Sequence, residues 1–148
     1  MKRLAVKNIN TESEYNRIFH EREKKGVDEF DLRRWNLLLK YYKGGRLLDA
    51  GCLDSVVSVM ARARYPTAEI WGMDHAEDAI RAMKEAHPET NWTTGNIYRT
   101  QFPNEYYDYV VAGEVIEHLE HPDRFIHEAF RILKPGGVLA LSTPKGET

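Results

Sequence analysis

The sequence predicts an open, doubly wound α/β domain with a mostly parallel sheet of about five strands. From residue 46 onward, short apolar runs alternate with helical segments, a pattern typical of right-handed β–α–β crossovers. The runs "DYVVAG" and "GVLALST" are apolar on both faces, as central parallel strands must be when helices cover both sides of the sheet. A chain of 148 residues fits one domain with its own hydrophobic core.

Two helices are expected before the sheet. The segment 11–14 has capping-box spacing, and Gly26 is a natural stop for the helix that follows. The apolar face of that helix consists of Tyr15, Ile18 and Phe19. A second helix is expected over 28–42, with an apolar stripe of Phe30, Trp35, Leu38 and Tyr42. We therefore expect an N-terminal helical cap (1–43) packed on a core (44–148), together forming one compact domain.

The remaining elements alternate in order. Strands are expected over 46–50, 68–73, 91–95, 107–113 and 137–143. Helices are expected over 55–65, 76–86 and 122–133. The segment "LKPGG" (133–137) is expected to end the last helix and to turn into the last strand.

Composition excludes several classes of protein. The net charge of −2 gives no basic field, so neither nucleic acid nor a membrane surface is an expected partner. The single cysteine, Cys52, excludes an internal disulfide and fits a reducing compartment. No apolar run approaches the roughly 18 residues that span a bilayer, and the first ten residues lack the apolar core of a signal peptide. The expectation is a cytoplasmic domain.

A ligand of such a sheet lies across the carboxyl ends of the strands, where the strand order reverses. The residues just after the predicted strands are Asp49 to Ser55, Asp74 and His75, Asn96 and Ile97, and Gly113 to His118. A glycine at 51 lets the backbone turn sharply into the next helix. A carboxylate at the end of the second strand can accept hydrogen bonds from a ribose diol, and an amide after the third can meet an adenine edge.

Five stretches together resemble a known family: "LLDAGC", "GMD", "GN", "YYDYVVAGEVIEHLEHP" and "ILKPGGVLALSTP". They are similar to the class I S-adenosylmethionine (SAM)-dependent methyltransferases, and in particular to the small-molecule type that includes the ubiquinone-biosynthesis O-methyltransferases. The resemblance covers roughly residues 44–144. It implies a Rossmann-like fold, SAM as cofactor, and methyl transfer to an O, N or C atom of a small-molecule acceptor.

The resemblance also implies which residues hold the cofactor. The loop with Asp49, Gly51 and Cys52 would take the methionine part. Asp74, with His75 beside it, would bind the ribose. By the same resemblance, the adenine would lie against Asn96 and Ile97. The methionine end would lie against Gly113 and Glu114.

The loop after the first strand departs from the family pattern. The family reads D-x-G-x-G-x-G, and this chain has leucine and serine at the last two glycine positions, Leu53 and Ser55. A positive φ there costs a residue with a Cβ roughly 1–2 kcal/mol. Leu53 can swing away, or it can fill the methionine pocket. The alternative function is therefore a weak or inactive methyltransferase-like scaffold. A dinucleotide site is disfavoured because the G-x-G-x-x-G fingerprint is absent.

Three side chains after the fourth strand suggest acid–base or metal chemistry. On a helical turn, Glu114, Glu117 and His118 would share one face, and such a set can bind a divalent ion. The resemblance sharpens this alternative, because E-x-x-E-H is a metal site in some ubiquinone-type and RNA 3′-end ribose methyltransferases. We expect no metal, and we take His118 as the candidate general base with Glu117 beside it. The acidic balance disfavours an RNA substrate.

The resemblance implies a further helix and two more strands, one antiparallel, which this chain lacks. Since an uncovered strand edge invites pairing, we expect a homodimer or a partner protein to cover that flank of the sheet.

Overall fold

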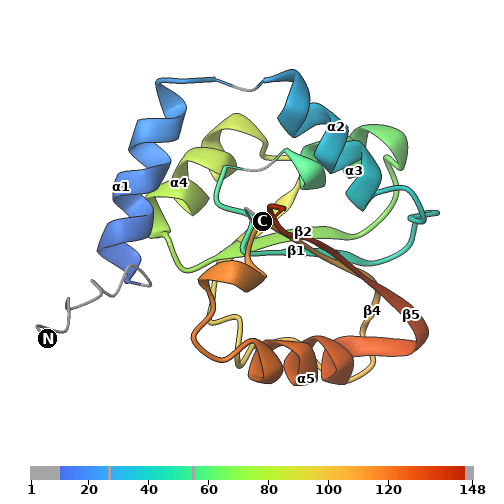
Figure 1. Cartoon of the computed structure of the whole chain (residues 1–148). Coiled ribbons are helices and arrows are strands. Elements are labelled where there is room, and N and C mark those ends of the chain that lie inside the picture. The colour runs from blue at the N-terminus through green and yellow to red at the C-terminus, as the bar shows by residue number, and fades with distance from the viewer. Residues whose placement is uncertain (1–10, 27, 55, 146–148) are drawn as a thin grey trace, which may run out of the picture.

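The computed structural model describes residues 11–26, 28–54 and 56–145, in which a five-stranded sheet carries helices on both faces (Figure 1). The strands are β1 (Leu47–Ala50), β2 (Ile70–Asp74), β3 (Asn91–Thr94), β4 (Tyr107–Gly113) and β5 (Leu133–Ser142). The helices are α1 (Glu12–Glu23), α2 (Glu29–Leu38), α3 (Val57–Arg64), α4 (Glu77–Ala86) and α5 (Pro122–Ile132), with a 3-10 helix, η1, at Ile116–His118. The expected alternation is confirmed.

The sheet order explains where a ligand can lie. Every pair of neighbouring strands is parallel, and the order is β3-β2-β1-β4-β5. The chain moves outward from β1 to β3, then returns to β4 beside β1 and moves the other way. Right-handed crossovers in opposite directions place α3 and α4 on one face and α5 on the other (Figure 1). The strand order thus reverses between β1 and β4, which is the switch point of a doubly wound sheet.

Two apolar layers flank the sheet. On one face, Trp35 and Leu38 of α2 and Val57 of α3 pack against inward-facing residues of β1 and β4. On the other face, Phe125 and Ile132 of α5 pack against the opposite side of the same strands. Burial on both faces accounts for the near-continuous apolar runs of β1 and β4.

The two N-terminal helices differ in what they cover. Helix α2 packs on α3, β4 and β5, whereas α1 packs on α4 (Figure 1). His20 of α1 lies 3.1 Å from Asp78 of α4, and the Asp78 amide donates to the Asn16 side chain at 3.3 Å. Helix α1 therefore contacts the core through α4, whereas α2 also contacts the strands β4 and β5. The side chains of its predicted apolar face, Tyr15, Ile18 and Phe19, lie outside the described residues, as does Ser55.

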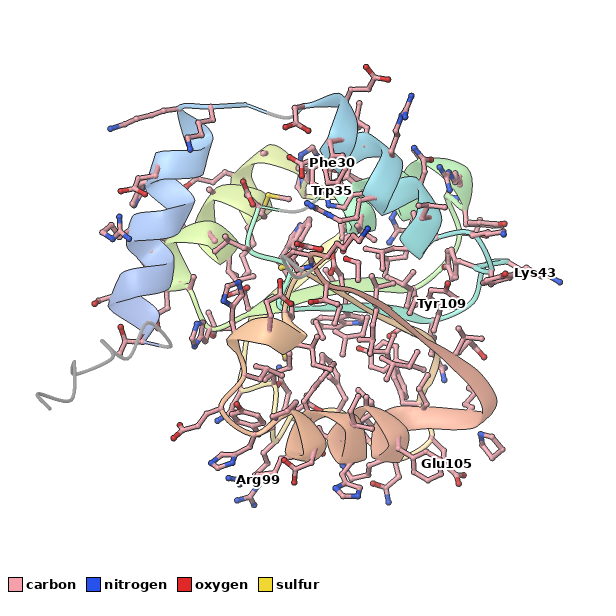
Figure 2. All side chains as sticks on the ribbon, viewed as in Figure 1. Phe30, Trp35, Lys43, Arg99, Glu105 and Tyr109 are labelled. Carbon is pink, nitrogen blue, oxygen red and sulfur yellow. The ribbon has the colours of Figure 1, made fainter. Side chains whose placement is uncertain are left out.

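Helix α2 also differs from its prediction in detail. It begins after Asp28, whose side chain accepts from the Asp31 amide at 2.8 Å, and it ends at Leu38 rather than at residue 42. Trp35, directed into the domain, is buried, whereas Phe30 is 72% exposed at the start of the helix (Figure 2). The predicted apolar stripe is thus confirmed for its C-terminal part and wrong for Phe30.

The last strand begins earlier than predicted. Leu133 already pairs with Tyr107, so the segment 133–137 belongs to β5 and is not a turn before it. The register shifts between Tyr107 and Tyr109, and Gly136 has a φ of +79°. The proline and glycines therefore form an irregularity within the strand. None of the described helices combines the length and the apolarity that crossing a membrane requires.

Candidate active site

A cavity of about 920 Å³ opens at the carboxyl ends of the first four strands, beside the switch point. This volume lies within the range of about 300–1,000 Å³ that is common for small-molecule sites. Eight of the nine predicted cofactor residues line it: Gly51, Cys52, Asp74, His75, Asn96, Ile97, Gly113 and Glu114. The two predicted catalytic residues, Glu117 and His118, line it as well. The exception is Asp49, which is buried below the cavity and accepts a hydrogen bond from the Ser58 hydroxyl at 3.3 Å.

Gly51 makes the turn that shapes the cavity floor. Its φ is +77°, and the amides of Gly51 and Cys52 both donate to the Met73 carbonyl, at 2.7 and 3.0 Å. A Cβ at position 51 would lie only 2.7 Å from a methyl carbon of Val115. Both the backbone conformation and the packing therefore require glycine here.

Leu53 has the conformation that the family's glycine would have. Its φ is +41°. Its side chain is buried against Ala76 and Ala79 at the start of α4, and its backbone amide donates a hydrogen bond to Asp74 at the end of β2. The residue contributes to the cavity wall. The leucine side chain is thus anchored on α4, and the cavity persists beside it.

Asp74 connects the loop after β1 to the start of α4 in the cavity wall. Its Oδ2 accepts from the Leu53 amide and its Oδ1 from the Ala76 amide, both at 2.8 Å. Burial raises the pKa of this carboxyl above its ordinary value, although the amide hydrogen bonds of Ala76 and Leu53 oppose the shift. Each carboxylate oxygen has more than one lone pair, so these bonds leave room for a ligand hydroxyl.

The residues after β3 and β1 complete the floor. Asn96 accepts from the Tyr98 amide at 2.8 Å, which fixes its side-chain oxygen and directs its amino group elsewhere. Ile97 is half-buried beside it. Burial raises the pKa of the Cys52 thiol well above its usual range, so this side chain is a small apolar filler.

The acids and the histidine after β4 do not lie on one helical turn. Glu114 has a φ of +57° and turns toward β5, where its amide and Oε1 both bond to Ser142, at 3.0 and 3.2 Å. Glu117 and His118 lie on η1, with 3.9 Å between Oε1 and Nε2. The expected single helical turn is wrong because the left-handed residue Glu114 lies outside η1, although all three residues line the cavity. Within residues 11–26, 28–54 and 56–145, no group of three or more His, Cys, Asp or Glu is placed to hold a metal ion.

Helix α2 forms one wall of the cavity, which the sequence did not predict. Asp31, Arg34 and Trp35 line the cavity, and Lys25 lies on its rim just before the helix. Arg34 bonds to Asp31 at 2.5 Å and approaches Glu114 to 3.8 Å. One signal was available: Arg34 directly precedes the buried Trp35 and lies four residues before Leu38, so it had to be near the buried side of the helix.

Comparisons with known proteins agree with this geometry. A family model described as "Methyltransferase domain" matches residues 48–141. A protein of Mycolicibacterium smegmatis named "Probable S-adenosylmethionine-dependent methyltransferase" is 33% identical over 106 residues, which are 68% of this chain and 38% of that protein. A demethylmenaquinone methyltransferase of Listeria welshimeri is 29% identical over 109 residues, 70% of this chain and 46% of that enzyme. The chain thus spans less than half the length of these relatives.

A solved structure shows the same fold. It is described as a "complex between the Haloferax volcanii Trm112 methyltransferase activator and the putative methyltransferase", and it matches with a TM-score of 0.75 and 19% identity. The match covers 88% of this chain and 60% of the other. At that identity the likeness concerns the fold alone.

Proposed function

The chain belongs to the methyltransferase-domain family, and from this premise we propose that it binds SAM at the carboxyl edge of its sheet and transfers the methyl group to a small-molecule acceptor. The observation that carries the proposal is the convergence of eight predicted cofactor residues, from the ends of β1, β2, β3 and β4, on one cavity. Residues so far apart in sequence meet there only because parallel strands end at one edge.

The residues present fit an adenosyl cofactor. Gly51, Asp74 and Asn96 follow β1, β2 and β3, so a backbone cradle, a carboxylate and an amide lie in the order that a methionyl, ribosyl and adenine group would need. The cradle exists because position 51 has no Cβ. Helix α3 begins just after this loop, and no phosphate-binding glycine pattern precedes it, which favours a cationic sulfonium ligand over a dinucleotide.

Each group of residues has a defined task in this proposal. When bound, the cofactor supplies an electrophilic methyl group on a sulfonium sulfur. Asp74, with His75 beside it, accepts the ribose hydroxyls, and Asn96 with Ile97 holds the adenine. Gly51, Cys52, Gly113 and Glu114 surround the methionine end, above the buried Asp49. Most of the rate enhancement then comes from holding donor and acceptor in line.

His118 is the residue we propose to accept the proton that an O or N acceptor loses. It lines the cavity, as Glu117 does, and its Nε2 lies 3.9 Å from Glu117 Oε1. The identity of the acceptor atom, O, N or C, is left open by this arrangement.

The enzyme is favoured over an inactive scaffold. The scaffold hypothesis required Leu53 to fill the methionine pocket. Its side chain packs instead on Ala76 and Ala79, and its amide supports Asp74. The unusual leucine is therefore compatible with a working loop.

The proposal is tested by titration calorimetry with SAM and S-adenosylhomocysteine, followed by transfer of a radiolabelled methyl group into a pool of small-molecule acceptors. We expect heat of binding, an affinity that is lower by about tenfold or more in Asp74→Asn, and labelled product that depends on His118. Absence of heat at millimolar ligand refutes cofactor binding. Binding without transfer to any acceptor revives the scaffold hypothesis.

Two further features of the proposal concern assembly. We propose that residues 1–43 act as a cap on the core of 44–148, since α2 supplies one wall of the cavity. We also propose that a second copy or a partner protein covers the outer edge of β5, which is an edge strand of the described sheet. Leu141 on β5 and Ile126 and Phe130 on α5 are exposed apolar side chains. The Haloferax volcanii neighbour provides a precedent for a methyltransferase that assembles with another chain.

A further inference from the structure

Helix α2 carries a row of apolar side chains on its exposed side. Phe30 is 72% exposed, Leu37 69% and Tyr41 64%. Phe30 and Leu37 lie two turns apart and therefore on one line along the helix. Tyr41 follows in the turn that extends α2, where the Lys40 amide donates to the Leu37 carbonyl at 3.1 Å. Single exposed apolar residues are normal, but four of the seven large ones in the described part of the chain belong to α2 and this turn, so they form a cluster.

Basic side chains accompany this row. Arg33, Lys40 and Lys43 are exposed, and Lys43 extends away from the domain beyond the end of the helix (Figure 2). Lys40 Nζ lies 5.2 Å from the centre of the Tyr41 ring. Arg33 pairs with Glu29 at 3.2 Å, whereas Lys40 and Lys43 form no ion pair with any residue that the structure describes. This side of the helix therefore carries a local excess of positive charge, although the net charge of the whole chain is −2.

Together these side chains form a surface, the α2 face, which consists of Phe30, Arg33, Leu37, Lys40, Tyr41 and Lys43. Its chemistry suits an anionic lipid surface, because apolar tips can enter the boundary below the headgroups while the cations meet the phosphates. An RNA strand is disfavoured, because Leu37 lies between the two aromatic residues and offers a base no ring to stack on. A protein partner is disfavoured because lysine is depleted in protein interfaces.

We propose that the α2 face docks on an anionic lipid bilayer. The expectation that no membrane surface is a partner came from the net charge of the whole chain, whereas docking depends on the charges within about one Debye length of the lipid. Helix α2 also supplies one wall of the cavity, so the docked protein would hold that wall beside the headgroups. The inference goes beyond the proposed function and does not rest on it, because docking requires neither the cofactor nor a methyl acceptor.

The test is co-sedimentation of the whole chain with two sets of vesicles, one of phosphatidylcholine alone and one with about one third phosphatidylglycerol. We expect binding to the anionic vesicles that weakens as the salt concentration rises, and little binding to the neutral ones. Leu37→Ser and Lys40→Glu should each weaken binding to the anionic vesicles by about tenfold or more. Lys84→Glu is the matched control, because it makes the same charge change at an exposed position in the last turn of α4. It should bind like wild type.

Binding to heparin separates lipid docking from attraction to any polyanion. Heparin offers no apolar phase, so Lys40→Glu should weaken its binding and Leu37→Ser should not. A Leu37→Ser variant that binds the anionic vesicles as tightly as wild type overturns the inference, because the apolar row then takes no part. Wild type that binds neither set of vesicles overturns it as well, including when a protein or an RNA is retained through Lys40 instead. Circular dichroism melting checks that each variant is folded, which we expect because the substituted side chains are exposed.

Discussion

The backbone amide of Leu53 donates a 2.8 Å hydrogen bond to Oδ2 of Asp74, which joins the loop after β1 to the end of β2. Because Oδ1 of the same carboxylate accepts from Ala76, one side chain also fixes the first turn of α4. The residue proposed to bind ribose is thus also the residue that holds the cavity floor together. Its substitution should affect stability and ligand binding at once.

Replacing Asp74 by asparagine tests this double role. An amide can present its oxygen to only one of the two N–H donors, and its own amino group must face the other. We expect the free energy of unfolding to fall by about 1–3 kcal/mol and the affinity for S-adenosylhomocysteine to fall by about tenfold or more. Urea denaturation and calorimetry measure the two effects. Asp123→Asn, on the exposed side of α5, is the control. An asparagine variant at position 74 that binds as tightly as wild type contradicts the assignment.

Substitutions of Leu53 separate packing from backbone strain. Both Leu53→Ala and Leu53→Gly remove the contacts with Ala76 and Ala79, at a cost of about 2–3 kcal/mol. Only Leu53→Gly also relieves the strain of the left-handed backbone conformation, and this relief stabilises the variant by about 1 kcal/mol. The expected order of stability in urea is wild type, then Leu53→Gly, then Leu53→Ala. An alanine variant at least as stable as the glycine variant would show that position 53 is not left-handed.

Because of Glu128, we expect the protein to lose stability in acid. Burial opposes its ionisation, but hydrogen bonds from Arg131 and Thr100 lower its pKa to about 2. Because the folded pKa is depressed, the ionised form stabilises the native state above the unfolded value of about 4.3. That contribution is lost as the pH falls from there toward 2.

The measurement is urea denaturation of wild type and Glu128→Gln across this pH range. The variant should be less stable at neutral pH by about 2 kcal/mol and should lose less stability in acid than wild type does. Glu120→Gln, at an exposed position, should follow the wild-type curve. Parallel acid curves for wild type and Glu128→Gln would contradict the role of Glu128.

Cys52 should be protected from thiol reagents in the native state. Its side chain is 1% exposed, and burial raises the pKa of its thiol. Because this is the only cysteine of the chain, a colorimetric disulfide reagent reports on it alone. We expect slow modification in buffer, rapid modification in denaturant and further slowing by S-adenosylhomocysteine, which would hold the loop closed. Immediate reaction of the native protein would show that the loop beside Gly51 is open.

We predict that the protein associates through the outer edge of β5, either with a second copy of itself or with a partner protein. Among the described strands, β5 ends the sheet and offers backbone groups on its outer edge, and Ile126 and Phe130 on α5 expose apolar surface. Light scattering at micromolar concentration should show a dimer, and Phe130→Glu should dissociate it. A monomer that also fails to retain a partner protein in affinity capture contradicts the prediction.

Much of the fold could be read from sequence because its signals are local. The apolar run of β4 was placed at its observed bounds, 107–113. The start of β5 was misplaced because a proline and two glycines resemble a turn, and only the partner strand shows that Leu133 already pairs with Tyr107. Phe30 was assigned to the core because helical periodicity cannot distinguish packing on a guanidinium from packing in the interior.

The part of the candidate site that follows the strand ends could be predicted from the sequence. The part that depends on how distant elements pack against each other could not. Asp74 and Asn96 could be placed because every parallel strand ends at the same edge. Glu114 was expected on a helical face, and its left-handed backbone could not be anticipated for a residue with a side chain. Arg34 carried no motif, and its importance arises only because α2 lies across the cavity beside the end of β4.

The most direct test is a crystal structure of the protein grown with S-adenosylhomocysteine. The account predicts density for the nucleoside along the carboxyl edge of the sheet, with ribose hydroxyls on Asp74, adenine near Asn96 and the amino-acid end between Gly51 and Glu114. Leu53 should remain packed on Ala76 and Ala79. A cavity without ligand at saturating concentration, or a ligand bound away from Gly51 and Asp74, would contradict it.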